Sequence, residues 1–290
     1  MTLPPTVPGT AAGPWRGGRL SERVDCVLAP NPGPMTLDGT NTYLLSEPGS
    51  AQAVVVDPGP DDPRHLDSVV TALSSRGQRA ALVLLTHGHA DHSGGAAELA
   101  RRLRCPVRAV DPTHRSGPDG LADTDQVVVD GLHIEVVATP GHTGDSVSLV
   151  LPQEQAVLTG DTVLGRGTTV VAHPDGRLAD YLASLDRLAR LAERTPEMTL
   201  LPGHGPAGAP VSAVVAFYQA HRAARLDQVV AAVGDGATDV DAIVAAVYAE
   251  VDRTLWPAAC LSVQAQRDHL VAVGRLLLRD GSLKVSGRDA

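Results

Sequence analysis

Five histidines and two aspartates recur along the chain in an order that could hold metal ions. Four of the seven lie in one hexapeptide, His87-Gly88-His89-Ala90-Asp91-His92, and the other three are His142, Asp161 and His204. Imidazole nitrogens and carboxylate oxygens suit zinc and similar first-row metals, and the absence of thiolates argues against a closed structural zinc site. The residue types therefore predict a catalytic metal site.

Each of these residues follows a short apolar segment. Residues 80–85 precede the hexapeptide, 136–138 precede His142, 157–158 precede Asp161 and 198–201 precede His204. We expect strands that end in turns, because side chains on loops at one rim of a sheet can converge from distant parts of the sequence. Four donors within six residues cannot share one face of a helix or strand, so we expect a tight turn across the hexapeptide.

This ordered set resembles the signature of the metallo-β-lactamase superfamily, a His-x-His-x-Asp-His run followed by a His, an Asp and a His. The resemblance covers roughly residues 20–210. It implies an α/β fold, a four-layer αββα sandwich with a dinuclear metal site at one edge of its two sheets. It also implies two ligand groups bridged by Asp161: His87, His89 and His142 for one metal, and Asp91, His92 and His204 for the other.

The implied cofactors are two zinc ions, although His/Asp sites also accept metals such as iron or manganese. Two ions about 3.5–4 Å apart polarise a bridging water, and we expect the resulting hydroxide to be the nucleophile of a hydrolase. The ions would also stabilise negative charge on the substrate oxygen. Asp91 and Asp161 are the expected catalytic carboxylates. Asp91 could ligate a metal, orient the water or take its proton; we expect ligation.

Composition narrows the setting. The chain has 290 residues, of which 43% are hydrophobic and only seven aromatic, so a large core must consist mainly of Val, Leu and Ala. Three isolated cysteines give neither a disulfide framework nor a thiolate site, which fits a reducing cytoplasm. Residues 1–18 are rich in Pro and Gly and are predicted to be a flexible tail. No segment has the apolar length of a membrane span.

Periodicity predicts alternating strands and helices up to about residue 210. The expected strands are 42–46, 53–57, 107–110, 126–129, 133–137 and 147–151, and the expected helices are 63–75, 96–103 and 180–191. His65 would then lie in a surface helix. Beyond residue 210 we expect helices at 211–233, 240–251 and 257–278, followed by a turn at 279–282. The predicted domains are 19–210 and a helical, winged-helix-like module at 211–290.

The resemblance extends to proteins similar to β-lactamase-like protein 2, which carry such a C-terminal module. The residues that carry it are Gly39-Thr40-Asn41-Thr42-Tyr43-Leu44-Leu45, the segment from Thr159 to Val170, and Tyr218-Gln219-Ala220-His221-Arg222. The known member of that subgroup is a metal-dependent endonuclease of single-stranded RNA, which implies a single-stranded RNA substrate.

Charge favours an alternative substrate class. The net charge is −9, and residues 221–290 contain eight Lys or Arg against nine Asp or Glu, whereas RNA binding draws much of its strength from basic residues. Few aromatic residues are available to stack unpaired bases. The alternative is a hydrolase of small ester or thioester metabolites, similar to glyoxalase II, with Arg166 and the His221-Arg222 pair as the basic candidates near its pocket. A metal-free binding protein and a homodimer remain open.

Overall fold

Two β-sheets form the centre of the larger part of the molecule. The computed structural model describes residues 7–9, 13–279 and 281–286. The first sheet has the order β1-β2-β3-β4-β5-β6 and the second β11-β10-β9-β8-β7. Their strands are β1 (Gly18–Arg19), β2 (Val24–Leu28), β3 (Asn41–Leu45), β4 (Gln52–Val56), β5 (Arg79–Leu84), β6 (Val107–Arg108), β7 (Gln126–Val129), β8 (Leu132–Ala138), β9 (Val147–Leu151), β10 (Ala156–Gly160) and β11 (Thr199–Pro202).

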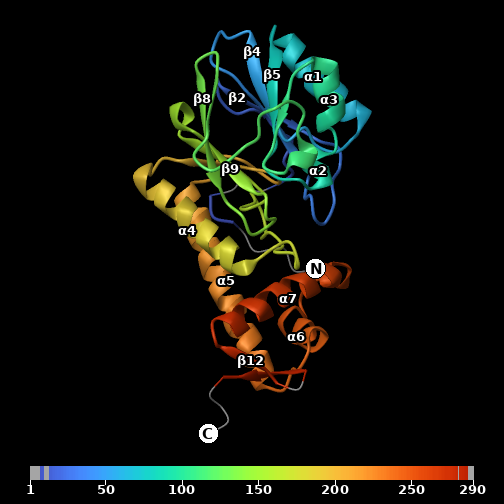
Figure 1. Ribbon diagram of the computed structural model, residues 1–290, viewed down its shortest axis with the longest axis vertical. Helices are drawn as coiled ribbons and strands as arrows, with labels where there is room; N and C mark the ends of the chain where they lie inside the picture. The colour runs from blue at the N-terminus through green and yellow to red at the C-terminus, as the bar shows by residue number, and fades with distance from the viewer. Residues whose placement is uncertain (1–6, 10–12, 280, 287–290) are drawn as a thin grey trace.

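Helices cover the outer faces of both sheets (Figure 1). On the first sheet these are α1 (Pro63–Ser75) and α3 (Ala96–Leu103), with the one-turn helix α2 (Ala90–Ser93) between them in the chain. The second sheet is covered by α4 (Leu178–Arg194) and the start of α5 (Val211–Gly234). Short 3₁₀ turns lie at Pro112–His114, Pro152–Glu154 and Arg253–Leu255. The result is a four-layer αββα sandwich, as the resemblance implied.

Strand alternation explains why the core has three layers. In β5, Leu82 and Leu84 point between the two sheets, while Val83 packs against α1 and α3. In β10, Leu158 points between the sheets and Val157 packs under α4 and α5. Successive side chains of a strand face opposite ways, so a strand that is apolar at every position is buried on both faces. These central strands hold the loops at their ends in fixed positions.

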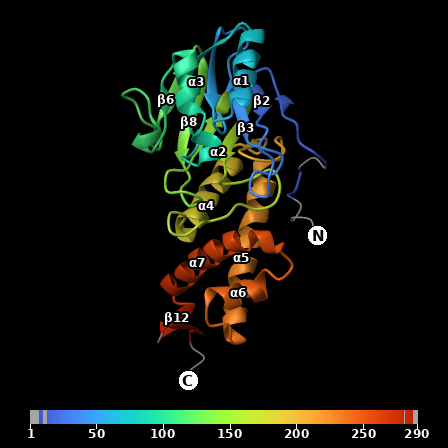
Figure 2. The same cartoon turned by 90° about the vertical axis from the view of Figure 1, so that its right-hand side faces the viewer.

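The C-terminal part is a small helical module with a hairpin. It contains α6 (Val240–Val247), α7 (Trp256–Ala272) and the paired strands β12 (Leu276–Arg279) and β13 (Ser282–Val285). Helix α5 packs on α4 and runs on into this module, as both views show (Figures 1 and 2). The proposed division after residue 210 therefore falls at the start of a helix that both parts share.

Several predicted elements have the observed bounds, including the helices at 63–75 and 96–103 and the strands at 126–129 and 147–151. The predicted helix 257–278 is wrong at its end. It stops at Ala272, Gly274 adopts a φ of +71°, and the apolar residues from Leu276 form a strand. An apolar run can fit either periodicity until a glycine with positive φ interrupts it.

Parts of the segment that was predicted as a flexible tail contact the sandwich. Val7 is 1% exposed and belongs to the core under α4 and α5, and the indole Nε1 of Trp15 donates to Asn41 Oδ1 at 2.7 Å. These apolar and amphipathic side chains hold parts of the segment against the sandwich despite its Pro and Gly content. Residues 1–6 and 10–12 of the predicted tail lie outside the described residues. Within the described chain no helix is long and apolar enough to cross a membrane.

Candidate metal centre

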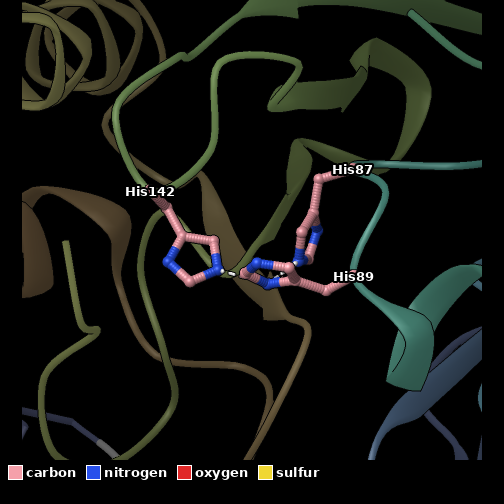
Figure 3. A group of neighbouring side chains, drawn as sticks. All are labelled: His87, His89 and His142. Atoms are coloured by element: carbon pink, nitrogen blue, oxygen red, sulfur yellow. Dashed lines mark hydrogen bonds between the residues drawn. The ribbon is translucent and has the colours of Figure 1, made fainter. Parts of the chain in front are cut away.

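Three of the sequence-predicted ligands converge from two loops at the edge of the sheets. His87 and His89 follow β5, and His142 lies between β8 and β9 (Figure 3). His89 Nδ1 lies 3.2 Å from His87 Nε2 and 3.0 Å from His142 Nε2. Two nitrogens bound to a tetrahedral zinc at about 2.0–2.1 Å would be roughly 3.3 Å apart. The three nitrogens thus have the spacing of a common metal ligand set.

A second group lies beside the first. The Nε2 atoms of His92 and His204 are 3.2 Å apart, and Asp91 Oδ2 lies 3.6 Å from the former and 3.1 Å from the latter. His92 and His204 are fully buried, whereas 30% of the Asp91 side chain is exposed. These are the three residues that the resemblance assigned to the second metal, and they form a compact group of potential ligands.

Asp161 touches both groups. Its carboxylate lies 3.8 Å from His142 Nε2, 3.4 Å from His92 Nε2 and 3.3 Å from His204 Nε2. Its Oδ1 atom is buried and accepts no hydrogen bond. A buried carboxylate oxygen without a hydrogen-bond partner is costly, and a cation at this position would satisfy it. The donor set, the nitrogen spacing and this oxygen together fit a pair of divalent metal ions.

Outer hydrogen bonds fix the ring nitrogens that face inward. The Nδ1 atoms of His142 and His204 donate to the carbonyl oxygens of Val170 and Gly39, at 2.7 and 3.1 Å. His92 Nδ1 donates to Asp57 Oδ2 at 2.9 Å. Donation from Nδ1 leaves the Nε2 lone pair free for a metal, so these acceptors select the ligating tautomer.

Asp57 is a functional residue that sequence reasoning missed. Its carboxylate accepts the backbone N–H of Thr86 at 2.8 Å, the Thr86 hydroxyl at 2.7 Å and His92 Nδ1. Thr86 Oγ1 is thereby committed as a donor, so it accepts from His87 Nδ1 at 3.1 Å. Asp57, His87 and His92 also form a compact donor group. We assign Asp57 as an outer partner and not a ligand, because both of its oxygens are already used inside the fold.

The hexapeptide is divided between two local structures. His87 to His89 lie in a loop without regular secondary structure, whereas Asp91 and His92 lie in the short helix α2. This division sends the first two histidines toward one group and the following Asp-His pair toward the other. A Cβ on Gly203 would lie 2.7 Å from His92 Cε1 and would overlap Asp161 Oδ1. The backbone before His204 therefore approaches the site at a distance only glycine permits.

The two ligand groups differ in their protonation without metal. Burial, with neighbouring His92, holds the pKa of His87 well below its usual value, and burial lowers that of His142. Burial also acts to lower the pKa of His204, but the Asp161 charge outweighs it and raises that pKa to about 9. The His92 pKa is raised in the same way by Asp161 and Asp57, against the effect of burial. Without metal, His87 and His142 are thus neutral, whereas His92 and His204 hold protons.

The basic candidates near the pocket are not free. Arg166 pairs with Asp38 and donates to the Gly13 carbonyl oxygen. Arg222 is buried beneath the sandwich loops and donates to the carbonyl oxygen of Thr169. Burial, with the nearby Arg222 charge, lowers the pKa of His221 to about 4, so that imidazole is neutral at neutral pH.

His65 does not lie on the surface as predicted. It is 1% exposed, and its Nε2 lies 2.8 Å from Thr42 Oγ1, which donates to the backbone carbonyl oxygen of Asp57. The helical periodicity predicted one buried face that includes Leu66. In the fold His65, the preceding residue of α1, is buried as well. His65 is thus connected to the backbone of Asp57 through Thr42, by two successive hydrogen bonds.

Comparisons with known proteins agree with this geometry. A family model described as "Metallo-beta-lactamase superfamily" matches residues 35–204, and one described as "Beta-lactamase associated winged helix domain" matches residues 240–277. A β-lactamase-like protein 2 homolog of Caenorhabditis elegans is 34% identical over 220 residues, which cover 73% of this chain and 71% of that protein.

Two further similarities extend the comparison. An atrochrysone carboxyl ACP thioesterase of Aspergillus fumigatus is 37% identical over 190 residues, covering 64% of this chain and 57% of that protein. The crystal structure of a β-lactamase domain protein from Burkholderia ambifaria superposes with a TM-score of 0.80 at 24% identity, covering 97% of both chains. The latter shows that the sandwich and the module occur together in one fold.

Proposed function

The chain belongs to the metallo-β-lactamase superfamily and is a metal-dependent hydrolase, and we propose that two metal ions act together in its site on small acyl esters or thioesters. The convergence of seven donor side chains into two groups joined by Asp161 carries the dinuclear part of the proposal. We take the ions to be zinc, with iron or manganese as substitutes, since His/Asp sets accept several first-row metals.

Each group has a role set by its position. His87, His89 and His142 would hold one ion, and Asp91, His92 and His204 the other, with Asp161 between them. When bound, such ions lower the pKa of a shared water and stabilise negative charge on the substrate oxygen. Asp57 and the backbone carbonyl oxygens keep the ring nitrogens aimed inward. Asp91 is the more exposed carboxylate of the set, with 30% of its side chain exposed, so it is placed to receive a proton from the attacking water.

Charge at the site favours an acyl substrate. Arg166 is paired with Asp38, Arg222 is buried and His221 is neutral. The three basic candidates predicted beside a glyoxalase-like pocket are therefore not available to bind anionic groups, whether those belong to RNA or to an anionic thioester. A neutral ester or thioester carbonyl needs no such contacts, because its developing negative charge lies at the metal site. The 37% identical relative named as an ACP thioesterase supports the same substrate class.

The test measures hydrolysis of a panel of acyl thioesters, from short-chain to aromatic acyl groups. Hydrolysis is monitored by the release of free thiol. The native chain reconstituted with zinc is compared with Asp161→Ala prepared in parallel, which controls for contaminating esterases. We expect thiol release by the native chain alone. A metal-loaded chain that hydrolyses no ester or thioester would refute the substrate class.

Cleavage of single-stranded RNA is a second candidate. It is supported by the match of residues 240–277 to the β-lactamase-associated winged helix domain, since the RNA-cleaving subgroup that the sequence resembles carries such a module. The same two proteins are therefore incubated with end-labelled single-stranded RNA. Cleavage by the native chain, with no thioester hydrolysis, would favour the nuclease. Its salt dependence would then be shallow, because few basic residues remain to displace counterions from phosphates.

A further inference from the structure

Arg222 on α5 is a buried guanidinium that forms no ion pair with any residue the structure describes. It is 4% exposed, its Nη2 donates to the Thr169 carbonyl oxygen at 2.6 Å, and its Cζ lies 4.9 Å from the ring centroid of Tyr181. Its Nε is buried and has no hydrogen-bond partner. A buried charge without a counter-ion is costly, so stability alone does not account for an arginine at this position.

The segment that Arg222 holds is the one that orients a metal ligand. His142 Nδ1 donates to the carbonyl oxygen of Val170, the residue after Thr169. Thr169 Oγ1 also lies 3.2 Å from the same nitrogen. The guanidinium therefore binds the backbone of Thr169. The oxygens of Thr169 and of the adjacent Val170 in turn contact the ring of His142.

Two tyrosines on the same pair of helices hold the neighbouring loop. Tyr181 on α4 donates from its hydroxyl to the Thr162 carbonyl oxygen at 2.7 Å. Tyr218 on α5 accepts the Leu164 N–H at 2.9 Å. The two backbone groups lie one and three residues after Asp161 in the chain. The aromatic rings and the guanidinium thus form a polar support beneath the loops that carry Asp161 and His142.

We propose that Arg222 is a positioning residue for the metal site, which it serves by holding Thr169 and Val170 and, through them, the ring of His142. The proposal rests on the proposed function, since it concerns the ligand group of His87, His89 and His142. Helix α5 sets its position, and the same helix continues into the C-terminal module (Figure 2).

Charge alone predicts the opposite effect of removing Arg222. A positive side chain near two divalent cations repels them, so its loss by itself would tighten metal binding. Loss of positioning would instead let the His142 ring turn away from its inward orientation and weaken binding. The sign of the change in metal affinity therefore separates the two effects.

The same helix provides a matched control one turn later. Arg225 donates to the Val247 carbonyl oxygen at 2.8 Å, and its Cζ lies 4.6 Å from the ring centroid of Tyr248. It makes the same two kinds of contact as Arg222, but toward the C-terminal module. Arg222→Met and Arg225→Met thus each remove a hydrogen bond to a backbone carbonyl oxygen and a cation–π contact from α5. Arg225 is partly exposed and also donates to Gln228 Oε1 at 2.9 Å.

The experiment titrates native, R222M and R225M proteins with zinc against a competing chelator and measures thermal unfolding of each metal-free chain. For R222M we expect about tenfold weaker binding of one of the two ions, the low end of the effect of outer partners of metal ligands. We expect metal-free R222M to unfold near the native temperature, and its kcat to fall while the KM for a thioester is kept. R225M should bind both ions as the native chain does.

Equal or tighter zinc binding by a folded R222M would overturn the role of Arg222. A native chain that takes up fewer than two ions would instead refute the dinuclear site, whatever R222M does. If R222M does not fold, Arg222→Lys decides, because lysine keeps the charge but loses the planar fork and its stacking. Weaker binding of one ion by R222K supports the proposal, and native binding refutes it.

Discussion

Replacement of Asp57 by asparagine tests whether outer hydrogen bonds set the ligating tautomers. The Asp57 carboxylate accepts three hydrogen bonds, two from Thr86 and one from His92 Nδ1. Asp57 has a φ of +51°, a conformation that asparagine tolerates, so Asp57→Asn keeps both the shape and the backbone. The change replaces one acceptor oxygen with an NH₂ donor and removes the negative charge.

Neither orientation of the new amide satisfies its neighbours. With the amide nitrogen toward His92, that ring must accept at Nδ1, and its proton moves to Nε2, which faces His204 and Asp161. With the amide reversed, its nitrogen meets the backbone N–H of Thr86. A buried donor left without an acceptor costs about 1–3 kcal/mol of stability. Loss of an outer partner costs about 10–100-fold in metal affinity, or about 1.4–2.8 kcal/mol.

The assay measures zinc per chain over a series of chelator-buffered free zinc concentrations. We expect D57N to lose affinity for the ion held by His92 and to unfold at lower urea concentration when metal-free. Asp130→Asn is the matched control, because Asp130 is an exposed aspartate with a φ of +46° in the turn between β7 and β8. If D57N held two ions with native affinity, the assignment of Asp57 as an outer partner would be wrong.

Three further outcomes follow from the site. Asp161→Ala should abolish turnover and lower metal content while circular dichroism shows most of the fold retained; unchanged turnover would contradict its bridging position. Burial lowers the pKa of His65 to about 4. Between pH 6.5 and 4 the unfolded chain therefore binds a proton at His65 that the folded chain does not, so the free energy of unfolding decreases as the pH is lowered. In urea titrations of the metal-free protein, His65→Gln should remove at most about 3 kcal/mol of this decrease. Gly203→Ala should reduce metal content with little loss of fold, because its Cβ would displace His92 and Asp161; full metal content would show that the backbone can move.

The positions of the candidate ligands could be predicted because each follows an apolar segment that forms a strand. The apolar segments before His87, His142, Asp161 and His204 are β5, β8, β10 and the start of β11. β5, β10 and β11 are buried over most of their length, so the residues that follow them have little freedom, whereas β8 alternates between buried and more exposed side chains. The short helix α2 could not be predicted in the same way, since four residues show no full helical repeat and the glycine at 88 suggested only a turn.

Asp57 could not be found from the sequence because its partners are distant in the chain. It ends β4, and only the parallel pairing of β4 with β5 brings it beside Thr86 and His92. In the sequence it is one acidic residue before Pro58 and Gly59, a pattern common to ordinary turns. The only available signal was that a predicted strand ended in a carboxylate next to the strand that leads into the hexapeptide.

The formal charges of Arg166 and Arg222 overstate the positive charge that is available near the site. A sequence count treats Arg166 and Arg222 as two positive charges available near the site. In the fold one is paired with Asp38, and the other is enclosed between Tyr181 and the Thr169 carbonyl oxygen. Neither can meet a phosphate chain without breaking an internal contact, which is consistent with the proposal of a neutral acyl substrate.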